Sequence, residues 1–360
     1  MKHYLFLLCA TMALSSMASQ ASRETENELS DAEHHVTQRI YNHKPSAPES
    51  RSYHWAMTKH HEAMQTHHEE QADKFQSAFL CNRAIPQASL PLFADLRPHM
   101  PPCYDQGQLG ACTGNACAGL IENAQMNAGL PSMTPSRLAL YYHARYLEGT
   151  VPEDSGATIT DIIQAMAFGI PPENEFPYTN YQATFTQQPS PICYKDGVSL
   201  FDHEQISYVS VPQNAKSIKQ HLAAGRAVII GIQVYDGDHG LESTSAAQTG
   251  MVEMPAPNAN ALGGHAVLLV GYDDRNTVND KGGHAVANPL KGRYIVRNSW
   301  GPDWGENGHF FLPQDFVHNP NYAYDFWTIS KLIKPANASK MQGSLKETID
   351  FFKPKSRCTV

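Results

Sequence analysis

The stretch Asp105–Ala116, DQGQLGACTGNA, runs from a glycine-rich turn into the start of a predicted helix that ends at Gly129. Cys112 stands in the first turn of this helix. The helix dipole and the unpaired backbone N–H groups at that end favour a thiolate, which is a strong nucleophile. A buried cysteine is also a common small core residue. The position of Cys112 alone therefore leaves both roles open.

Helical and strand patterns occupy different parts of the chain. Two further helical patterns cover residues 135–149 and 157–169, and each ends at a glycine. From about Ile206, short apolar runs alternate with Gly, Asn and Asp, which is typical of β-strands. Helices followed by strands predict an α+β fold with two lobes, about 89–200 and 201–335.

Two copies of the pentapeptide GGHAV, at residues 263–267 and 282–286, offer two candidate histidines downstream of the cysteine. His265 is followed by Ala and then by VLLVGYDD, which suits a buried strand. His284 is followed by Ala-Val-Ala and then an Asn-Pro pair, which does not fit a central strand. We therefore predict that His265 is the functional copy and that residues 275–292 form a surface insertion.

Asn298 ends the next strand pattern and is followed by two tryptophans among glycines. A cysteine protease needs a thiol, an imidazole that takes up and returns its proton, and a group that orients the imidazole. Cys112, His265 and Asn298 supply these three groups in that chain order.

The sequence resembles the papain family of cysteine proteases in DQGQLGACTGNA, GGHAVLLVGYDD and RNSWGPDWGENGHFFL, and more weakly over about residues 90–335. The resemblance implies a papain-like two-lobed α+β fold. In it, an N-terminal helical lobe has a central helix that carries the nucleophile, and the C-terminal lobe is antiparallel and β-barrel-like. The active-site cleft lies between the lobes.

The resemblance also implies roles for single residues. Cys112 becomes the nucleophile, His265 the general base and then acid, and Asn298 the group that orients the imidazole. The side chain of Gln106 and the backbone N–H of Cys112 form the oxyanion hole. Trp300 covers the His–Asn contact.

Three further positions are implied to bind substrate. Trp304 would line the leaving-group side of the cleft, Gly156 would bind the substrate backbone, and Ala266 would line the main specificity pocket. For Trp300 and Trp304 the alternative is ordinary core packing. No metal or cofactor is expected.

The sequence departs from the family pattern near the nucleophile. Leu109 replaces the cysteine of a disulfide that braces the active-site loop, and Thr113 replaces an aromatic residue. The brace is therefore lost or replaced, for example by a bridge from Cys103 or Cys117. The usual glycine pair appears as DSGA at residues 154–157, with one glycine kept.

Residues 1–21 have the basic start, apolar stretch and small residues of a secretory signal peptide, so we expect a secreted protein. Export makes disulfide bonds possible. With Cys112 as the nucleophile, an odd number of cysteines remains after residue 21 and their pairing stays open. These are Cys81, Cys103, Cys117, Cys193 and Cys358.

Residues 22–88 hold the place of an inhibitory propeptide, with eight histidines between His34 and His68. We predict that this segment blocks the cleft until it is cleaved near residues 85–92. Its histidines would gain charge below about pH 6.5 and loosen it. The alternatives are a polar tail without a switch and, less in keeping with the ligand spacing, a metal site. The basic and aromatic tail 336–360 is either a docking helix or a frayed end.

Charge and hydropathy limit the partners. The net charge is −8, from 27 Lys and Arg against 35 Asp and Glu, and no basic stripe with interleaved aromatics occurs, so nucleic acid is not expected. No segment predicts a membrane span. We expect a monomer that acts on protein or peptide substrates. Transamidation or deamidation by the same triad remains an alternative, as does a non-catalytic binding protein on a protease fold.

Overall fold

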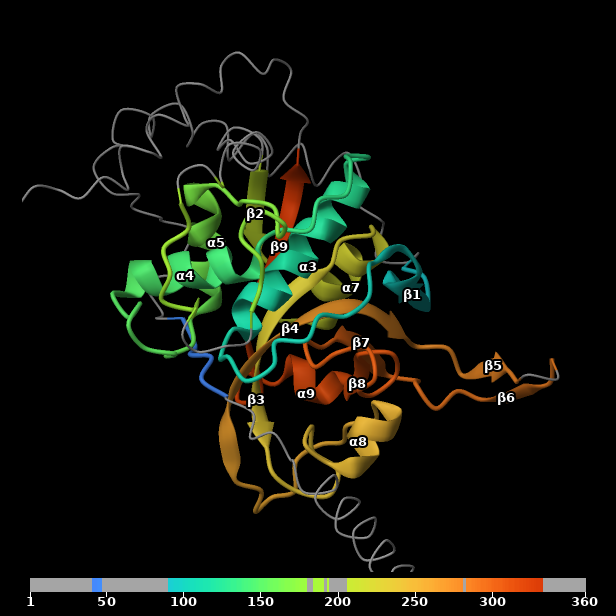
Figure 1. Cartoon of the computed structure of the whole chain (residues 1–360). Coiled ribbons are helices and arrows are strands. Elements are labelled where there is room, and N and C mark those ends of the chain that lie inside the picture. The colour runs from blue at the N-terminus through green and yellow to red at the C-terminus, as the bar shows by residue number, and fades with distance from the viewer. Residues whose placement is uncertain are drawn as a thin grey trace, which may run out of the picture. The chain divides into compact units, whose positions relative to one another are not determined.

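The computed structural model describes residues 41–46, 90–179, 184–190, 193, 206–280 and 283–332. The predicted signal peptide, most of the predicted propeptide, Cys81, Cys358 and the C-terminal tail lie outside this part of the chain. Figure 1 shows the arrangement of the described helices and strands.

The central helix α3 (Cys112–Asn127) is buried from Cys112 to Gln125, and it begins where the sequence predicts. Small residues let its neighbours approach closely. A Cβ on Gly114 would lie 2.6 Å from the carbonyl oxygen of Arg137, and a Cβ on Gly119 would lie 3.3 Å from Leu268. The helix therefore packs tightly against a second helix on one side and a strand on the other.

The other helices of this half have clear start and stop signals. In α4 (Arg137–Glu148), the Ser136 hydroxyl accepts a hydrogen bond from the backbone of the first turn, and Gly149 ends the helix in the left-handed conformation. Thr158 caps α5 (Ile159–Ala165) in the same way. Two short 3-10 helices, η3 (Arg97–His99) and η4 (Met166–Phe168), complete this half.

Seven strands form one antiparallel sheet in the order β2-β9-β3-β4-β7-β8, with β1 paired to β4. The described strands follow an open path with β2 and β8 at its ends, so the lobe is not a closed barrel. Their bounds are β1 Phe93–Asp95, β2 Ile206–Ser210, β3 Val228–Tyr235, β4 Ala261–Asp273, β7 Arg293–Arg297, β8 His309–Pro313 and β9 Ala323–Leu332.

Strand β4 is buried from Gly264 to Asp273, as expected from its apolar run. Its side chains alternate between two hydrophobic clusters. Leu268 and Val270 pack with α3, whereas Val267 and Leu269 join the opposite cluster. Two helices, α7 (Ala215–Ala223) and α9 (Gln314–His318), contribute to that opposite cluster, and α8 (Thr244–Thr249) follows β3.

The second GGHAV copy lies in a separate hairpin. Strands β5 (Thr277–Asn279) and β6 (Ala285–Ala287) pair with each other, and Figure 1 shows them extending away from the body. The His284 side chain is 81% exposed and lies 3.4 Å from a carboxylate oxygen of Asp280.

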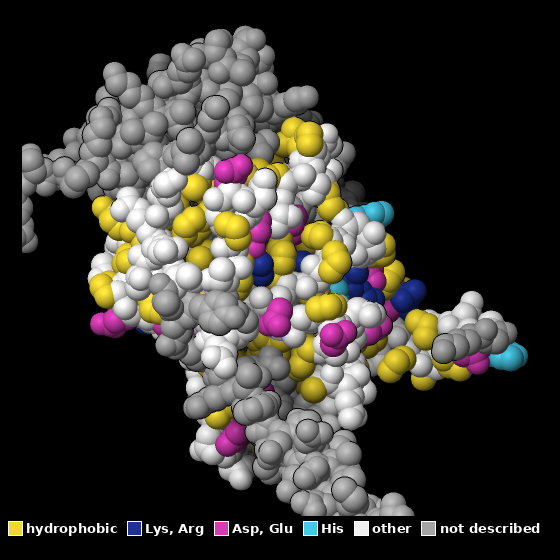
Figure 2. Space-filling model, in the orientation of Figure 1, with side chains coloured by type: hydrophobic (Ala, Val, Ile, Leu, Met, Phe, Trp, Pro, Cys, Tyr) yellow, Lys and Arg dark blue, Asp and Glu magenta, His cyan; other side chains and the backbone are white. Residues whose placement is uncertain are grey.

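On the face shown in Figure 2, Lys and Arg side chains are few and form no continuous stripe. None of the helices in the described residues combines the length and the apolar character that a membrane crossing requires.

Candidate active site

Cys112 is completely buried at the N-terminus of α3. Burial raises the pKa of its thiol to about 11, although hydrogen bonds with the backbone of Ala266, Thr113 and Cys112 itself act in the opposite direction. The groups that stabilise a thiolate are therefore in place, but desolvation outweighs them in this state of the chain. The contact with Ala266 also puts the thiol beside the strand that carries His265.

His265 is completely buried on β4 and pairs across the sheet with Ile232 of β3. Its Nε2 lies 2.9 Å from the Oδ1 of Asn298. Because an amide oxygen only accepts, Nε2 carries the hydrogen in this bond. The same oxygen accepts the backbone N–H of Ser299 at 2.9 Å, which fixes the orientation of the amide. The bond thus assigns the tautomer of His265.

The two tryptophans occupy successive layers over the histidine. The Trp300 ring stacks on His265 at a centroid distance of 5.2 Å and an interplanar angle of 27°. Trp304 contacts Trp300 edge-on at 4.8 Å and Phe310 at 5.8 Å. Trp300 therefore covers the imidazole directly, whereas Trp304 supports Trp300 and packs in the core as well.

Gln106 is buried and its amide is held at both ends. Its Oε1 accepts the hydroxyl of Ser299 at 2.5 Å, and its Nε2 donates to the carbonyl oxygen of Leu109 at 2.9 Å. Its backbone N–H also donates to the Ser299 carbonyl oxygen at 2.9 Å. Ser299 was not among the residues expected from the sequence; its place next to Asn298 is the one signal that points to it.

Residues Tyr41–Ser46, from the predicted propeptide, lie against this site. The His43 N–H donates to the Gly264 carbonyl oxygen at 3.2 Å. The Tyr41 ring meets the rings of His265 and Trp300 edge-on, at centroid distances of 6.0 and 6.1 Å. The segment therefore covers the imidazole and the ring stacked on it.

Glycines make room for this segment. Gly156 has φ +69°, and a Cβ at this position would lie 2.1 Å from the carbonyl oxygen of Asn42. A Cβ on Gly264 would lie equally close to the carbonyl oxygen of His43. The Asn42 side chain donates to the Asp154 carbonyl oxygen at 2.6 Å. Gly156 thus lies against the backbone of residue Asn42.

The side chain of His43 is buried in the protein interior. Its Nδ1 lies 2.8 Å from the Ala157 carbonyl oxygen, and its ring stacks on Tyr324 at 5.5 Å. Three residues later, the Ser46 N–H donates to the carboxylate of Asp325 at 2.6 Å. Burial lowers the pKa of His43 below its ordinary value, an effect that the charge of Asp325 and the Ala157 bond partly offset.

Ala266 is buried beside Cys112 and lines a small cavity with Asn115, Asn298 and Ser299. Its side chain belongs to the cluster that packs on α3. The structure therefore brings Ala266 to the nucleophile.

The four described cysteines, Cys103, Cys112, Cys117 and Cys193, are free thiols. The sequence left open two alternatives, loss of the disulfide brace or its replacement by a bridge from Cys103 or Cys117, and the structure has no such bridge at these two residues. The Cys103 sulfur instead lies 3.6 Å from the Nε2 of His309. Cys117 is fully buried on α3, in the core cluster that this helix shares with its neighbours.

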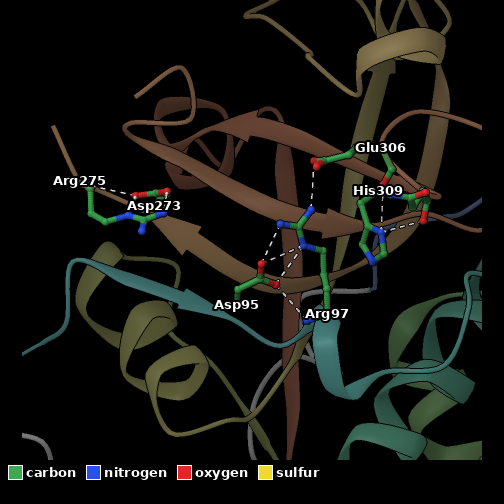
Figure 3. A network of polar contacts seen from close by, with 7 residues as sticks. Asp95, Arg97, Asp273, Arg275, Glu306 and His309 are labelled. Carbon is green, nitrogen blue, oxygen red and sulfur yellow. Dashed lines mark hydrogen bonds and ion pairs between the residues drawn. The ribbon is translucent and has the colours of Figure 1, made fainter. Parts of the chain in front are cut away.

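A polar network fastens the tryptophan loop to the start of the domain (Figure 3). Arg97 donates to Asp95 at 2.7 Å and to Glu306 at 3.1 Å. Glu306 follows Trp304 closely, so these bonds hold the loop that supports Trp300. Within the described residues, no group of three or more His, Cys, Asp or Glu side chains is arranged to hold a metal ion.

The chain is similar to known proteins in both sequence and structure. It is 33% identical over 240 residues to an uncharacterized peptidase C1-like protein of Acanthamoeba polyphaga mimivirus, covering 64% of this chain and 70% of that protein. It is 27% identical over 224 residues to a cathepsin B-like protein of Giardia intestinalis, covering 60% and 66%. The chain spans about two thirds of the length of these relatives.

The crystal structure of xylellain, a cysteine protease from Xylella fastidiosa, matches with a TM-score of 0.61 and 29% identity, covering 82% of this chain and 99% of that one. The family model described as papain family cysteine protease matches residues 90–321. The chain therefore belongs to the papain family of cysteine proteases, and it is a cysteine-type peptidase.

Proposed function

We propose that this protein is a secreted cysteine endopeptidase, made as a zymogen, in which Cys112, His265 and Asn298 form the catalytic triad. The observation that carries the proposal is the 2.9 Å bond from His265 to Asn298, beneath Trp300 and beside the buried thiol of Cys112. An imidazole oriented by an amide and next to a thiol is the arrangement that nucleophilic catalysis by cysteine requires.

The reaction follows from these groups. With Nε2 committed to Asn298, the Nδ1 of His265 takes the thiol proton, and the thiolate attacks the peptide carbonyl carbon. The negative oxygen that forms is stabilised by the Nε2–H of Gln106 and the backbone N–H of Cys112. His265 then gives its proton to the leaving amine, which leaves a thioester. Water, deprotonated by the same nitrogen, attacks the thioester carbonyl carbon, the C–S bond breaks, and the acid is released while the Cys112 thiolate takes the proton back from His265.

The zymogen part of the proposal rests on residues 41–46. They contact Gly156, Gly264, His265 and Trp300, the groups that a substrate backbone and the reaction would use. Cys112 has no exposed surface while they are in place. We infer that this segment occupies the path of a substrate and must leave before hydrolysis. Secretion is supported by the signal-like residues 1–21 of the sequence.

We expect this segment to be released faster at pH 5 than at pH 7.5. His43 docks as a neutral imidazole because burial lowers its pKa. Above its ordinary pKa of 6.5, both the docked and the released forms are neutral, and docking keeps its full stability. As the pH falls below 6.5, the released histidine gains a proton that the docked one resists, so docking weakens. The facing groups are the Asp325 carboxylate, Tyr324 and the Ala157 carbonyl.

The test compares the intact chain with His43→Phe, which keeps a ring to stack on Tyr324. The rate at which the thiol reacts with the inhibitor E-64 is measured at both pH values. The acceleration at pH 5 should be larger in the wild type, by up to about 30-fold, than in the variant. Taking the ratio cancels the pH dependence of the thiol itself. Equal acceleration in both proteins would remove His43 from the mechanism.

The proposed activity is tested on the processed protein. E-64 should label the wild type and not Cys112→Ala, and a library of fluorescence-quenched peptides should be cleaved. Labelling without cleavage, but with release of ammonia or incorporation of an amine, would favour deamidation or transamidation, because the acyl-enzyme is shared. Absence of labelling would instead leave a non-catalytic binding protein.

A further inference from the structure

The loop before the nucleophile is braced although it has no disulfide. Leu109 stands at the position of the usual cysteine, and the four described cysteines are free. The N–H of Gly110, two residues before Cys112, instead donates to both carboxylate oxygens of Asp154, at 3.0 and 3.2 Å. This contact joins the nucleophile loop to the DSGA segment, 44 residues away in the chain.

A buried tyrosine holds the carboxylate. The hydroxyl of Tyr141, on α4, donates to the Oδ1 of Asp154 at 2.5 Å and accepts the N–H of Gly156 at 3.1 Å. The Tyr141 side chain is fully buried, with the guanidinium of Arg145 over its ring at 4.1 Å. Because α4 is anchored in the core, the carboxylate has one fixed position from which to hold Gly110.

We propose that Asp154 is a positioning residue whose carboxylate, held by Tyr141, replaces the disulfide as the brace of the loop that carries Gln106 and Cys112. It fixes this loop relative to Gly156. The nucleophile, the oxyanion donors and the substrate backbone therefore keep constant positions relative to one another. The proposal rests on the proposed peptidase function of the site. A displacement of about 1 Å at a reacting group can lower the rate about 100-fold. Loss of the brace is expected to have an effect of this size.

The negative charge of Asp154 also acts on the ionisation of Cys112. This effect opposes catalysis, whereas the positioning of the loop favours it. The negative charge of Asp154 raises the pKa of the Cys112 thiol, after burial and the backbone hydrogen bonds as causes. Removing the charge therefore makes the thiolate easier to form while the loop becomes less well placed. The movement of the thiol pKa reports the charge alone, whereas the fall in kcat of the folded enzyme reports the position of the loop.

The experiment uses the full chain, processed as for the wild type, with Asp154→Ala and Asp154→Asn. We expect kcat to fall about 100-fold in the alanine variant and about 10-fold in the asparagine variant, which keeps one acceptor oxygen, with KM within threefold. The rate of inactivation by E-64 falls as the pH is lowered, and we call this part of the pH profile the acid limb. In both variants the acid limb should move to lower pH. Tyr141→Phe, which keeps the charge, should lower kcat without this movement.

Asp161→Asn is the matched control. This carboxylate accepts the hydroxyl of Thr158 at the start of α5, a helix that follows the DSGA segment. The control should lower thermal stability without moving the acid limb. Hydrogen exchange in a peptide spanning residues 104–114 provides a readout that needs no activity: it should speed up in the Asp154 variants and stay unchanged in Asp161→Asn.

The outcomes separate the two proposals. An inactive wild type with faster exchange in the Asp154 variants would contradict the peptidase function and keep the brace. An active wild type whose Asp154 variants match it in kcat, acid limb and exchange would overturn the brace. If the Asp154 variants do not fold, Tyr141→Phe with unchanged kcat and exchange would overturn it equally.

Discussion

We expect the replacement of His265 with alanine to abolish peptide hydrolysis and the same change at His284 to leave it intact. His265 donates to Asn298 at 2.9 Å, lies under Trp300 and follows in sequence a glycine that contacts residues 41–46. Without it, nothing accepts the thiol proton or protonates the leaving amine. Removal of one member of such a triad costs about 10⁴-fold or more in kcat. His284 lies on the exposed hairpin, where its side chain is close to the carboxylate of Asp280, four residues earlier in the chain.

The measurement is kcat/KM of both processed variants on the best peptide substrate, alongside the wild type. Circular dichroism checks that His265→Ala is folded, since a buried imidazole also packs. His284→Ala should remain within a factor of two of the wild type. Loss of activity in His284→Ala, with His265→Ala still active, would reassign the general base.

Two identical pentapeptides could be told apart from sequence because their flanks differ in physical character. VLLVGYDD can be buried along its whole length, and β4 is indeed buried from Gly264 to Asp273. The Asn-Pro pair after the second copy cannot continue a central strand. The start of α3 at Cys112 was predictable for a similar reason, since turn glycines and the C-terminal Gly129 are local signals.

Contacts between distant segments were not predictable in this way. The seating of Tyr41–Ser46 depends on two glycines that only the fold brings together, and no periodic pattern marks the segment. For the brace, the sequence suggested covalent candidates, Cys103 and Cys117, because cysteines are visible in a sequence. A carboxylate that accepts a backbone N–H 44 residues away leaves no signature.

The ionisation of Cys112 shows why a local argument can point the wrong way. The helix N-terminus favours a thiolate, yet burial raises the pKa of the thiol to about 11. Burial is a property of everything packed around the sulfur, so it cannot be read from the helix alone. We infer that departure of residues 41–46, by admitting water, lets the helix and the backbone donors act on the thiol.

Gln106→Ala should lower kcat by about 100- to 1,000-fold with little change in KM, because an oxyanion hole acts on a charge that exists only near the transition state. The Ser299 hydroxyl holds the Oε1 of Gln106, so the amide cannot flip without losing a 2.5 Å bond. One Nε2 hydrogen is donated to the Leu109 carbonyl oxygen. We propose that the second hydrogen is the one that an oxyanion formed at Cys112 would accept.

Two further variants sharpen this test. Gln106→Glu puts a carboxylate where negative charge develops, and it should be less active than the alanine variant. Ser299→Ala keeps the donor but removes the bond that orients it, so the loss should be smaller, about 10-fold, because the amide then spends part of its time flipped. The rank order wild type, Ser299→Ala, Gln106→Ala, Gln106→Glu in kcat is therefore expected from steady-state kinetics. If the kcat of Gln106→Ala were within threefold of the wild-type kcat, the backbone N–H of Cys112 and a donor other than Gln106 would stabilise the oxyanion.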